Sequence, residues 1–394
     1  MKHTVIKYVK KPQTIVAVVV ALMAQIIFCV VWMTAYDGVL DRVNHLKVAI
    51  VNQDGAAGEA LAKQLESDLP FEITELDQKQ AADRLIQRDV HLIVTIPEKF
   101  GQMLQTSGTQ AELTYTLNES NPQMTKSMMQ TVVTQVTNEM NRNAALQGTQ
   151  VVLQQLKLPA DQASHTAQSL MNKVHAQVQN LNKVDGMDNQ MVPMMLVLAS
   201  YVGAMLMAMN IHQVAQTIGS ACSTRQHFAV RALIILAAAA IISIAGSSLI
   251  AALGGQMASG FAAFWLFHFL TLVTFMFFAQ MFLVVFGMAG MFLNMMVLSL
   301  SLVTSGTIVP KQLLSSFYQS LGQFLPATYS VEGIMNLQFG GAHTEKDVWM
   351  LMVTMVCSAA ITAGAAAIKG RGKRVQAAAA DRPDAANVAE LSAH

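Results

Sequence analysis

Residues 261–309 read FAAFWLFHFLTLVTFMFFAQMFLVVFGMAGMFLNMMVLSLSLVTSGTIV, a continuous apolar run without one Asp, Glu, Lys or Arg. A helix needs about 20 mostly apolar residues to cross the hydrocarbon core of a bilayer, and this run is roughly twice as long. Gly287 and Gly290 interrupt the run, and glycines favour a tight turn. The run therefore predicts two membrane-spanning helices, residues 261–286 and 288–309, joined as a hairpin.

The composition of the whole chain agrees with a membrane protein. Of its 394 residues, 53% are hydrophobic and only 12% are charged, whereas about 25% are charged in a typical soluble domain. This balance excludes a soluble globular enzyme, a disordered chain and a nucleic-acid-binding protein. Four more apolar stretches, at 14–36, 191–211, 229–253 and 348–368, complete six predicted spans. The fold class is a polytopic α-helical membrane protein with a domain inserted between the first and second spans.

The distribution of charge predicts the orientation. Basic residues gather before the first span, around Arg225, and from Lys369 to Arg374, and a cytoplasmic N-terminus places all three groups on the cytoplasmic side. Residues 37–190 contain twelve basic and eighteen acidic residues, a net charge of −6, and would then lie outside the cell. We therefore expect cytoplasmic residues 1–13, a disordered cytoplasmic tail at 370–394, and a bacterial cell membrane as the location.

The inserted extracellular domain, residues 37–190, divides into two predicted parts. Residues 46–118 alternate four β-type stretches with helical ones, which indicates a small α/β unit with about four strands. Residues 122–183 are rich in Gln, Asn and Met, and apolar side chains recur along them at helical spacing on two arms. They predict a helical stalk, whose apolar seams serve either as ordinary core or as a surface for a dimer or an external partner.

No motif for catalysis or cofactor binding is visible. The segment GRGK at 370–373 lacks both the preceding strand and the following Ser or Thr of a phosphate-binding loop. His-Glu-x-x-His, Cys-x-x-Cys and Gly-x-Ser-x-Gly patterns are missing. We therefore expect neither catalytic, cofactor nor metal residues, and no ATP hydrolysis by this chain alone.

Polar residues inside the predicted spans are the candidates for a translocation path. The spans contain no Asp, Glu, Lys or Arg far from their ends. This disfavours ion-coupled transport, which usually needs ionisable groups at membrane depth. A polar side chain in a span more often hydrogen-bonds a neighbouring helix than contacts substrate, and both roles stay open here. The candidates are Gln25, Asn210, His268, Gln280 and Asn294.

Two segments outside the spans carry further information. The polar stretch 213–228, predicted as a cytoplasmic loop, is either a docking site for an ATPase or a solvated turn; its candidate residues are Gln213, Ser220, Ser223, Thr224 and Arg225. Residues 310–344 are too hydrophobic for a simple loop and are broken by Pro326. They predict short helices that dip into the outer leaflet or lie on it, in contact with membrane lipids.

Three stretches give the chain a resemblance to a known family. VAIVNQD at 48–54 opens the large outer domain, SGTIVP at 305–310 ends a span, and LPATYSVEGI follows at 325–334. With the layout of spans, they resemble the YhgE/Pip (phage infection protein) branch of type-2 ABC transporter permeases. The outer domain is shorter here than in the longest family members.

The resemblance implies a permease that exports an amphiphilic or hydrophobic substrate, such as a drug, a peptide or a lipid-linked molecule. It further implies a homodimer or heterodimer with a related permease, and a separate cytoplasmic ABC ATPase that hydrolyses ATP. Residues 1–13 would form an interface helix, and 213–228 would couple to the ATPase. Residues 310–344 would form an outer re-entrant segment, with the motif residues Pro310, Pro326, Thr328, Tyr329 and Gly333. The alternative is a cell-surface receptor, or an envelope or secretion scaffold, of the phage-infection-protein type.

Overall fold

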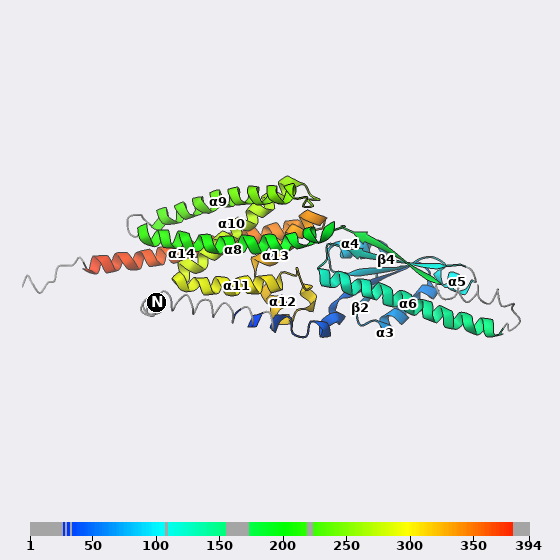
Figure 1. Ribbon diagram of the computed structural model, residues 1–394. Coiled ribbons are helices and arrows are strands. Elements are labelled where there is room, and N and C mark those ends of the chain that lie inside the picture. Colours follow the sequence, from blue (N-terminus) through cyan, green and yellow to red (C-terminus); the bar gives the residue numbers. More distant parts are fainter. Residues whose placement is uncertain are drawn as a thin grey trace, which may run out of the picture.

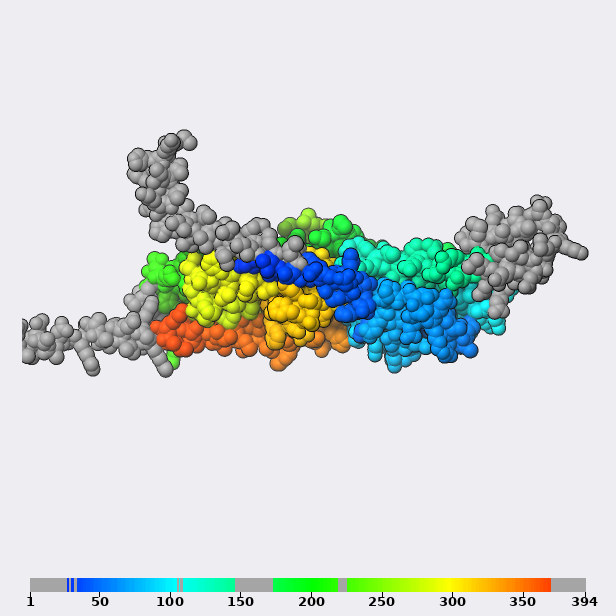
Figure 2. Space-filling model, turned by 90° about the horizontal axis from the view of Figure 1, so that it is seen from below, coloured from blue at the N-terminus to red at the C-terminus, as the bar shows by residue number. Residues whose placement is uncertain are grey.

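The structure, a computed structural model, describes residues 27, 30, 31, 34–106, 109–154, 173–218 and 224–380. It is elongated, with a β-sheet and its helices at one end and long helices running beside one another in the rest (Figure 1). We call residues 46–181 the sheet domain and residues 186–380 the helix bundle. Where they meet, the 3-10 helix η1 (Leu40–His45) lies against η4 (Lys311–Leu313), beside α12 (Ser316–Gly322) (Figure 2).

The sheet domain is built on a five-stranded mixed sheet in the order β2-β1-β3-β4-β5. Strand β1 pairs in parallel with both β2 and β3, β3 pairs antiparallel with β4, and β4 pairs in parallel with β5. The bounds are β1 Lys47–Asn52, β2 Glu72–Glu75, β3 Leu92–Ile96, β4 Ala111–Asn118 and β5 Val174–Leu181. The four strands expected from sequence are confirmed, and the fifth was missed.

Helices cover both faces of this sheet. Val48 and Ile50 share a core with α3 (Ala56–Asp68) and α5 (Phe100–Gln105) on one face, whereas Ala49 and Val51 pack with α4 (Gln78–Ile86) on the other. Strand β1 is therefore apolar from Val48 to Val51 without alternation, as expected where both faces are buried. The first core also takes in Val303 and Tyr318 from the helix bundle.

The predicted helical stalk is only half correct. Its first arm is the helix α6 (Gln123–Gln154), whose seam Met129, Val132, Val136 and Met140 packs into the core of the sheet domain. Its second arm is not helical where it is described, because residues 174–181 form β5 along the free edge of β4. Val174, Ala176 and Val178 alternate with polar residues, and backbone pairing with β4 decides in favour of the strand.

The helix bundle contains long apolar helices and shorter buried ones. Within the described residues, four helical stretches can cross a membrane by length and composition: Gly186–Ile218, Arg225–Ala252, Phe261–Thr304 and Thr344–Lys369. The elements are α8 (Gly186–Ile218), α9 (Thr224–Ala252), α10 (Phe261–Phe286), η3 (Gly287–Ala289), α11 (Gly290–Thr304), α13 (Pro326–Phe339) and α14 (Thr344–Ala380). This is a polytopic helical membrane protein.

The stretch Phe261–Thr304 is a hairpin. Gly287 ends α10 with φ of +64°, a conformation that favours glycine. A Cβ on Gly290 would lie 2.3 Å from the backbone oxygen of Phe282, so the chain doubles back tightly. Asn294 on α11 also donates to the carbonyl of Ala279 on α10 at 3.1 Å. The two glycines therefore make the turn that the sequence predicts, although α11 ends at Thr304 rather than near residue 309.

Other predicted boundaries differ from the structure. Most of the predicted span 14–36, and all of residues 1–13, lie outside the described residues. The predicted loop 213–228 is helical at both ends, because α8 runs to Ile218 and α9 begins at Thr224. The predicted disordered tail at 370–394 is wrong in its first part, since α14 continues to Ala380 through alanines with high helix propensity. Residues 381–394 lie outside the described residues.

Candidate functional site

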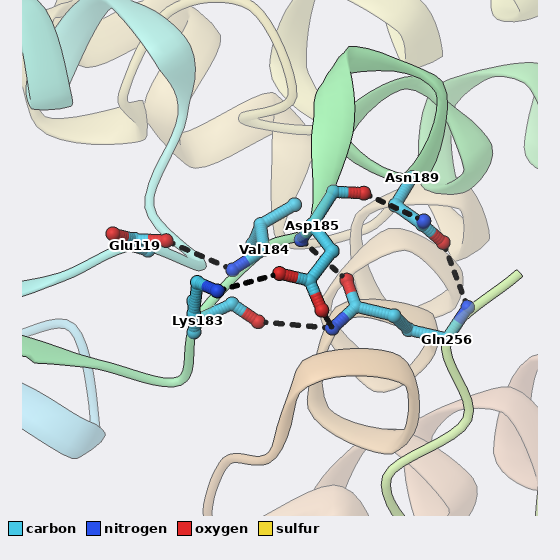
Figure 3. Close-up of polar contacts among 6 residues, drawn as sticks. All are labelled: Glu119, Lys183, Val184, Asp185, Asn189 and Gln256. Atoms are coloured by element: carbon cyan, nitrogen blue, oxygen red, sulfur yellow. Dashed lines mark hydrogen bonds and ion pairs between the residues drawn. The ribbon is translucent and has the colours of Figure 1, made fainter.

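Polar side chains tie the sheet domain to the helix bundle, and the first of these ties is the linker between β5 and α8. Gln256, in the loop between α9 and α10, accepts from the Asp185 backbone N–H at 2.9 Å and donates to the Lys183 carbonyl at 3.1 Å. On the sheet-domain side, Glu119 accepts from the Val184 N–H at 2.9 Å. Figure 3 shows these groups converging on the linker. The linker is therefore held from both sides.

A proline at the start of α8 extends this tie into the bundle. Pro193 has no N–H, so the carbonyl of Asn189 loses its usual helical donor. Gln338 on α13 donates Nε2–H to that carbonyl at 3.5 Å and to the Asn189 side-chain oxygen at 3.4 Å. The same side-chain oxygen accepts from the Gln256 backbone N–H at 2.7 Å (Figure 3). Asn189 thus joins α8, α13 and the α9–α10 loop.

Arg88 makes the second tie. It sits in the turn before β3 with φ of +60°, and its guanidinium donates to the Ser120 hydroxyl at 3.0 and 3.2 Å. It also donates to the side-chain oxygen of Asn336 on α13 at 2.7 Å. The Asn336 amide donates in turn to Asp347 at 3.4 Å. Burial lowers the pKa of Arg88, and the carboxylates of Glu332 and Asp347 oppose that shift.

Beside Arg88 lies a cavity of about 130 Å³ between the sheet domain and the bundle. Lys311 and Glu332 line it and form an ion pair at 2.8 Å, with 35% and 36% of their side chains exposed. Burial would raise the pKa of Glu332, but Lys311, Arg88 and Lys346 hold it below its ordinary value. Glu332 is therefore a carboxylate with cations around it.

The motif of the predicted outer re-entrant segment forms α13 and the turn before it. Pro326 occupies the first turn of α13, where its missing N–H costs nothing. The Tyr329 hydroxyl donates to the Gln323 carbonyl at 2.7 Å. A Cβ on Gly333 would lie 2.1 Å from the Phe267 ring, so glycine is needed where α13 meets α10. Thr328 is buried, and Pro310 lines the cavity.

The candidate path residues fall into different environments. His268 is buried between α8 and α9, with Ser200 3.3 Å from Nε2 and Ser247 3.1 Å from Nδ1. The side-chain oxygen of Asn294 accepts a hydrogen bond from the Tyr201 hydroxyl at 3.5 Å. Asn210 is exposed and bonds only its own helix, at Leu206, among the described residues. Gln25 lies outside the described residues.

Gln280 differs from Asn210, His268 and Asn294, the other candidates that the structure describes. It is 1% exposed, and neither atom of its amide has a hydrogen-bond partner within the described part of the chain. The hydroxyls of Ser299, Ser301 and Thr271 are buried in the same unpaired way. An unpaired buried polar group costs about 1–3 kcal/mol, so these groups destabilise the arrangement that the structure describes.

The described parts of the predicted coupling loop, the end of α8 and the start of α9, lie at the bundle end away from the sheet domain (Figure 1). Gln213 is an exposed residue within α8, and Arg225 is exposed at the start of α9. The side chain of Thr224 is not among those described, and Ser220 and Ser223 lie outside the described residues. Lys369 on α14 reaches the last carbonyls of α10 nearby, at 2.8 and 3.0 Å.

We call the contacts between the sheet domain and the helix bundle the junction, and the sequence did not predict the residues that form it. Arg88, Asn189, Gln256, Asn336 and Gln338 are single polar residues at the ends of elements, where polar residues are common. Only Glu332 carried a signal, because it is the one charge within the otherwise uncharged α13.

Comparison with known proteins gives the following. Residues 13–368 match the family model described as ABC-2 family transporter protein. A search of curated proteins found no match. Among solved structures, the crystal structure of a domain assigned to an ABC type-2 transporter from Thermotoga maritima MSB8 is similar to 34% of this chain and 84% of that chain, at 21% identity and a TM-score of 0.27.

Proposed function

The chain belongs to the ABC-2 family of transporter proteins, whose membrane permeases have no ATPase domain of their own and are energised by a partner ATPase, and we propose that it exports an amphiphilic or hydrophobic substrate. A drug, a peptide or a lipid-linked molecule has the required chemistry. The observation that supports the proposal is the length and the course of α8. This single helix of 33 residues runs from the tied junction to the opposite end of the bundle, where an ATPase can act on it (Figure 1).

We place the sheet domain outside the cell and both termini in the cytoplasm. Arg225 and Lys369 lie at the bundle end away from the sheet domain, as positively charged residues do on the cytoplasmic side. Residues 37–190, with a net charge of −6, form the outer part in this orientation. Residues 310–344 then lie at the outer face, close to the exit.

The coupling surface is the α8–α9 end of the bundle, including Gln213 and Arg225. An ATPase that closes against this end displaces α8 and α9, and rigid helices carry the displacement to the junction. Because Asn189 and Gln256 join α8 to α13 and to the start of α10, the outer ends of these helices move with it.

The translocation path would use the buried polar groups of the bundle, Gln280 above all. Two permease chains, identical or related, enclose the path, and opening between them releases the substrate at the outer face. The unpaired amide of Gln280 then finds its partners in the opened state.

Copurification and transport test this proposal. The chain, purified from its native membrane, should bring an ATPase with it, and proteoliposomes of the pair should export substrate only with ATP. Arg225→Ala should lower ATP-dependent export, whereas Arg142→Ala, an exposed arginine on α6, should leave it unchanged. If no ATPase associates with the chain and Arg225→Ala leaves the export rate unchanged, the permease proposal is wrong. The receptor or scaffold alternative is then favoured.

A further inference from the structure

The cavity at the junction has the chemistry of a binding site. It is lined from the sheet domain by Arg88, His91 and Asn121 and from the bundle by Lys311 and Glu332. We propose that it binds an oxyanion, a phosphate or carboxylate group, as the head group of the exported amphiphile. This inference rests on the proposed function, and it narrows the substrate class to acidic amphiphiles.

Hydrogen-bond donors dominate the lining. The Lys47 backbone N–H points at Nδ1 of His91 at 3.2 Å, which makes Nδ1 the acceptor and leaves the proton on Nε2 as a donor. Lys311 uses one of its three N–H groups on Glu332. Arg88 uses three of its five N–H groups on Ser120 and Asn336. His91, Lys311 and Arg88 therefore each keep at least one N–H group that can donate to a ligand.

The charge of the lining also favours an anion. Within the lining, Arg88 and Lys311 contribute two positive charges against the single negative charge of Glu332, and the carboxyl of Asp347 lies behind Asn336, outside the lining. Burial lowers the pKa of His91 to about 4 and keeps it neutral near pH 7. Arginine and lysine are the usual protein ligands of phosphate and carboxylate groups. Glu332 competes with a bound anion for Lys311, which suits a site that must release its ligand.

A buried acceptor without a partner points to the same place. Asn121 is 2% exposed, lines the cavity, and its side-chain oxygen has no hydrogen-bond partner within the described part of the chain. A protonated phosphate oxygen, or a hydroxyl next to the acidic group, would satisfy it. A ligand that carries both an oxyanion and such a donor therefore fits the whole lining.

The size of the cavity limits what enters it. A volume of about 130 Å³ is small beside the roughly 300–1,000 Å³ of pockets that bury a drug-sized ligand. One phosphate group with a short polar substituent fits, but acyl chains do not. Lys311 and Glu332, about one-third exposed, mark the open side. The apolar part of an amphiphile must therefore stay outside, toward the membrane.

Calorimetric titration of the purified full chain in detergent tests the site. The probes are dihexanoyl phosphatidic acid, inorganic phosphate, and dihexanoyl glycerol as the uncharged control. Lys311→Met should weaken binding of the acidic lipid about tenfold, the effect of losing one hydrogen bond to a charged group. Glu332→Gln should tighten binding, because it removes the competing carboxylate. Lys63→Met, an exposed lysine on α3, is the matched control and should change nothing.

The tightening by Glu332→Gln separates a binding site from a structural ion pair, since loss of a merely structural pair would not improve affinity. Binding of both phosphatidic acid and phosphate with this pattern supports a head-group site. Saturable binding of phosphate alone assigns the oxyanion site to a free anion and overturns its role for the amphiphile. No saturable binding, or binding that ignores both substitutions, overturns the site itself. The titration needs no ATPase, so its failure leaves ATP-driven export standing, and failure of the export test leaves the titration standing.

Discussion

The amides that tie the junction together are better paired than the Gln280 amide inside the helix bundle, although Asn121 Oδ1 and Gln338 Oε1 at the junction also have no partner among the described residues. At the junction, the amides of Asn189, Gln256 and Asn336 each bond to more than one group, across segments far apart in the chain. Inside the bundle, the Gln280 amide has no partner among the described residues. A polar network with its bonds made holds elements in one arrangement, whereas an unpaired group costs free energy in that arrangement. We infer that the junction moves as a unit and that rearrangement occurs inside the bundle.

The largest effect is expected at Arg88. Arg88→Met removes the cation that Asn336 and Ser120 hold near two carboxylates, and Asp347 is only 2% exposed. Losing a hydrogen bond from a charged donor costs about 1.5–3 kcal/mol, and both Ser120 and Asn336 lose theirs, so the free energy of unfolding should fall by about 4 kcal/mol. Denaturant titration in detergent measures it. Arg142→Met, on the exposed face of α6, should change it by less than about 0.5 kcal/mol, and an equal loss in the two variants would contradict the tie.

The second effect is a dependence on pH at the edge of the junction. His91 is 2% exposed, and burial lowers its pKa to about 4, whereas the unfolded chain protonates it near its ordinary value of 6.5. The neutral His91 side chain therefore contributes roughly 3 kcal/mol to the free energy of unfolding. This contribution is complete above pH 6.5 and is lost as the pH falls to about 4.

The matched variant for this prediction is His91→Asn, which keeps a side-chain acceptor for the Lys47 N–H but does not titrate. Its free energy of unfolding should fall less between pH 6.5 and 4 than that of the unchanged chain. Parallel curves for the two proteins would show that His91 is not the group responsible.

The outcome of the sequence predictions follows from how local each signal is. The hairpin at Gly287 and Gly290 was predictable, because the turn and both apolar helices are adjacent in the chain. Strand β5 was not, since Val174 and Val178 fit a helical spacing too, and its partner β4 lies more than fifty residues away. Arg88 looked like an ordinary turn residue, because its contact with the bundle is to Asn336, which is distant along the chain and near it only in the fold.

Gly333 tests how tightly α13 is fixed to the bundle. Gly333→Ala places a Cβ about where the Phe267 ring now lies, and Phe267 is only 4% exposed. Overpacking of this kind costs about 2 kcal/mol, which thermal unfolding in detergent would detect as a lower midpoint. Gly364→Ala in α14 meets nothing within 4 Å and should be neutral or raise stability by up to about 1 kcal/mol. A similar loss in both would mean that α13 yields to the added methyl.

The smallest effect on stability is expected at Gln280, and it separates the two regions most directly. Gln280→Leu removes an unpaired buried amide, so the free energy of unfolding should stay the same or rise by up to about 1 kcal/mol. Gln256→Leu at the junction should instead lower it by about 1 kcal/mol, because it removes the hydrogen bonds to the Asp185 N–H and the Lys183 carbonyl, which are exposed to water. Export should fall in Gln280→Leu despite the retained stability, because the opened path loses its polar group. Equal stability losses in the two variants would mean that Gln280 is paired after all, and the contrast between junction and bundle would no longer hold.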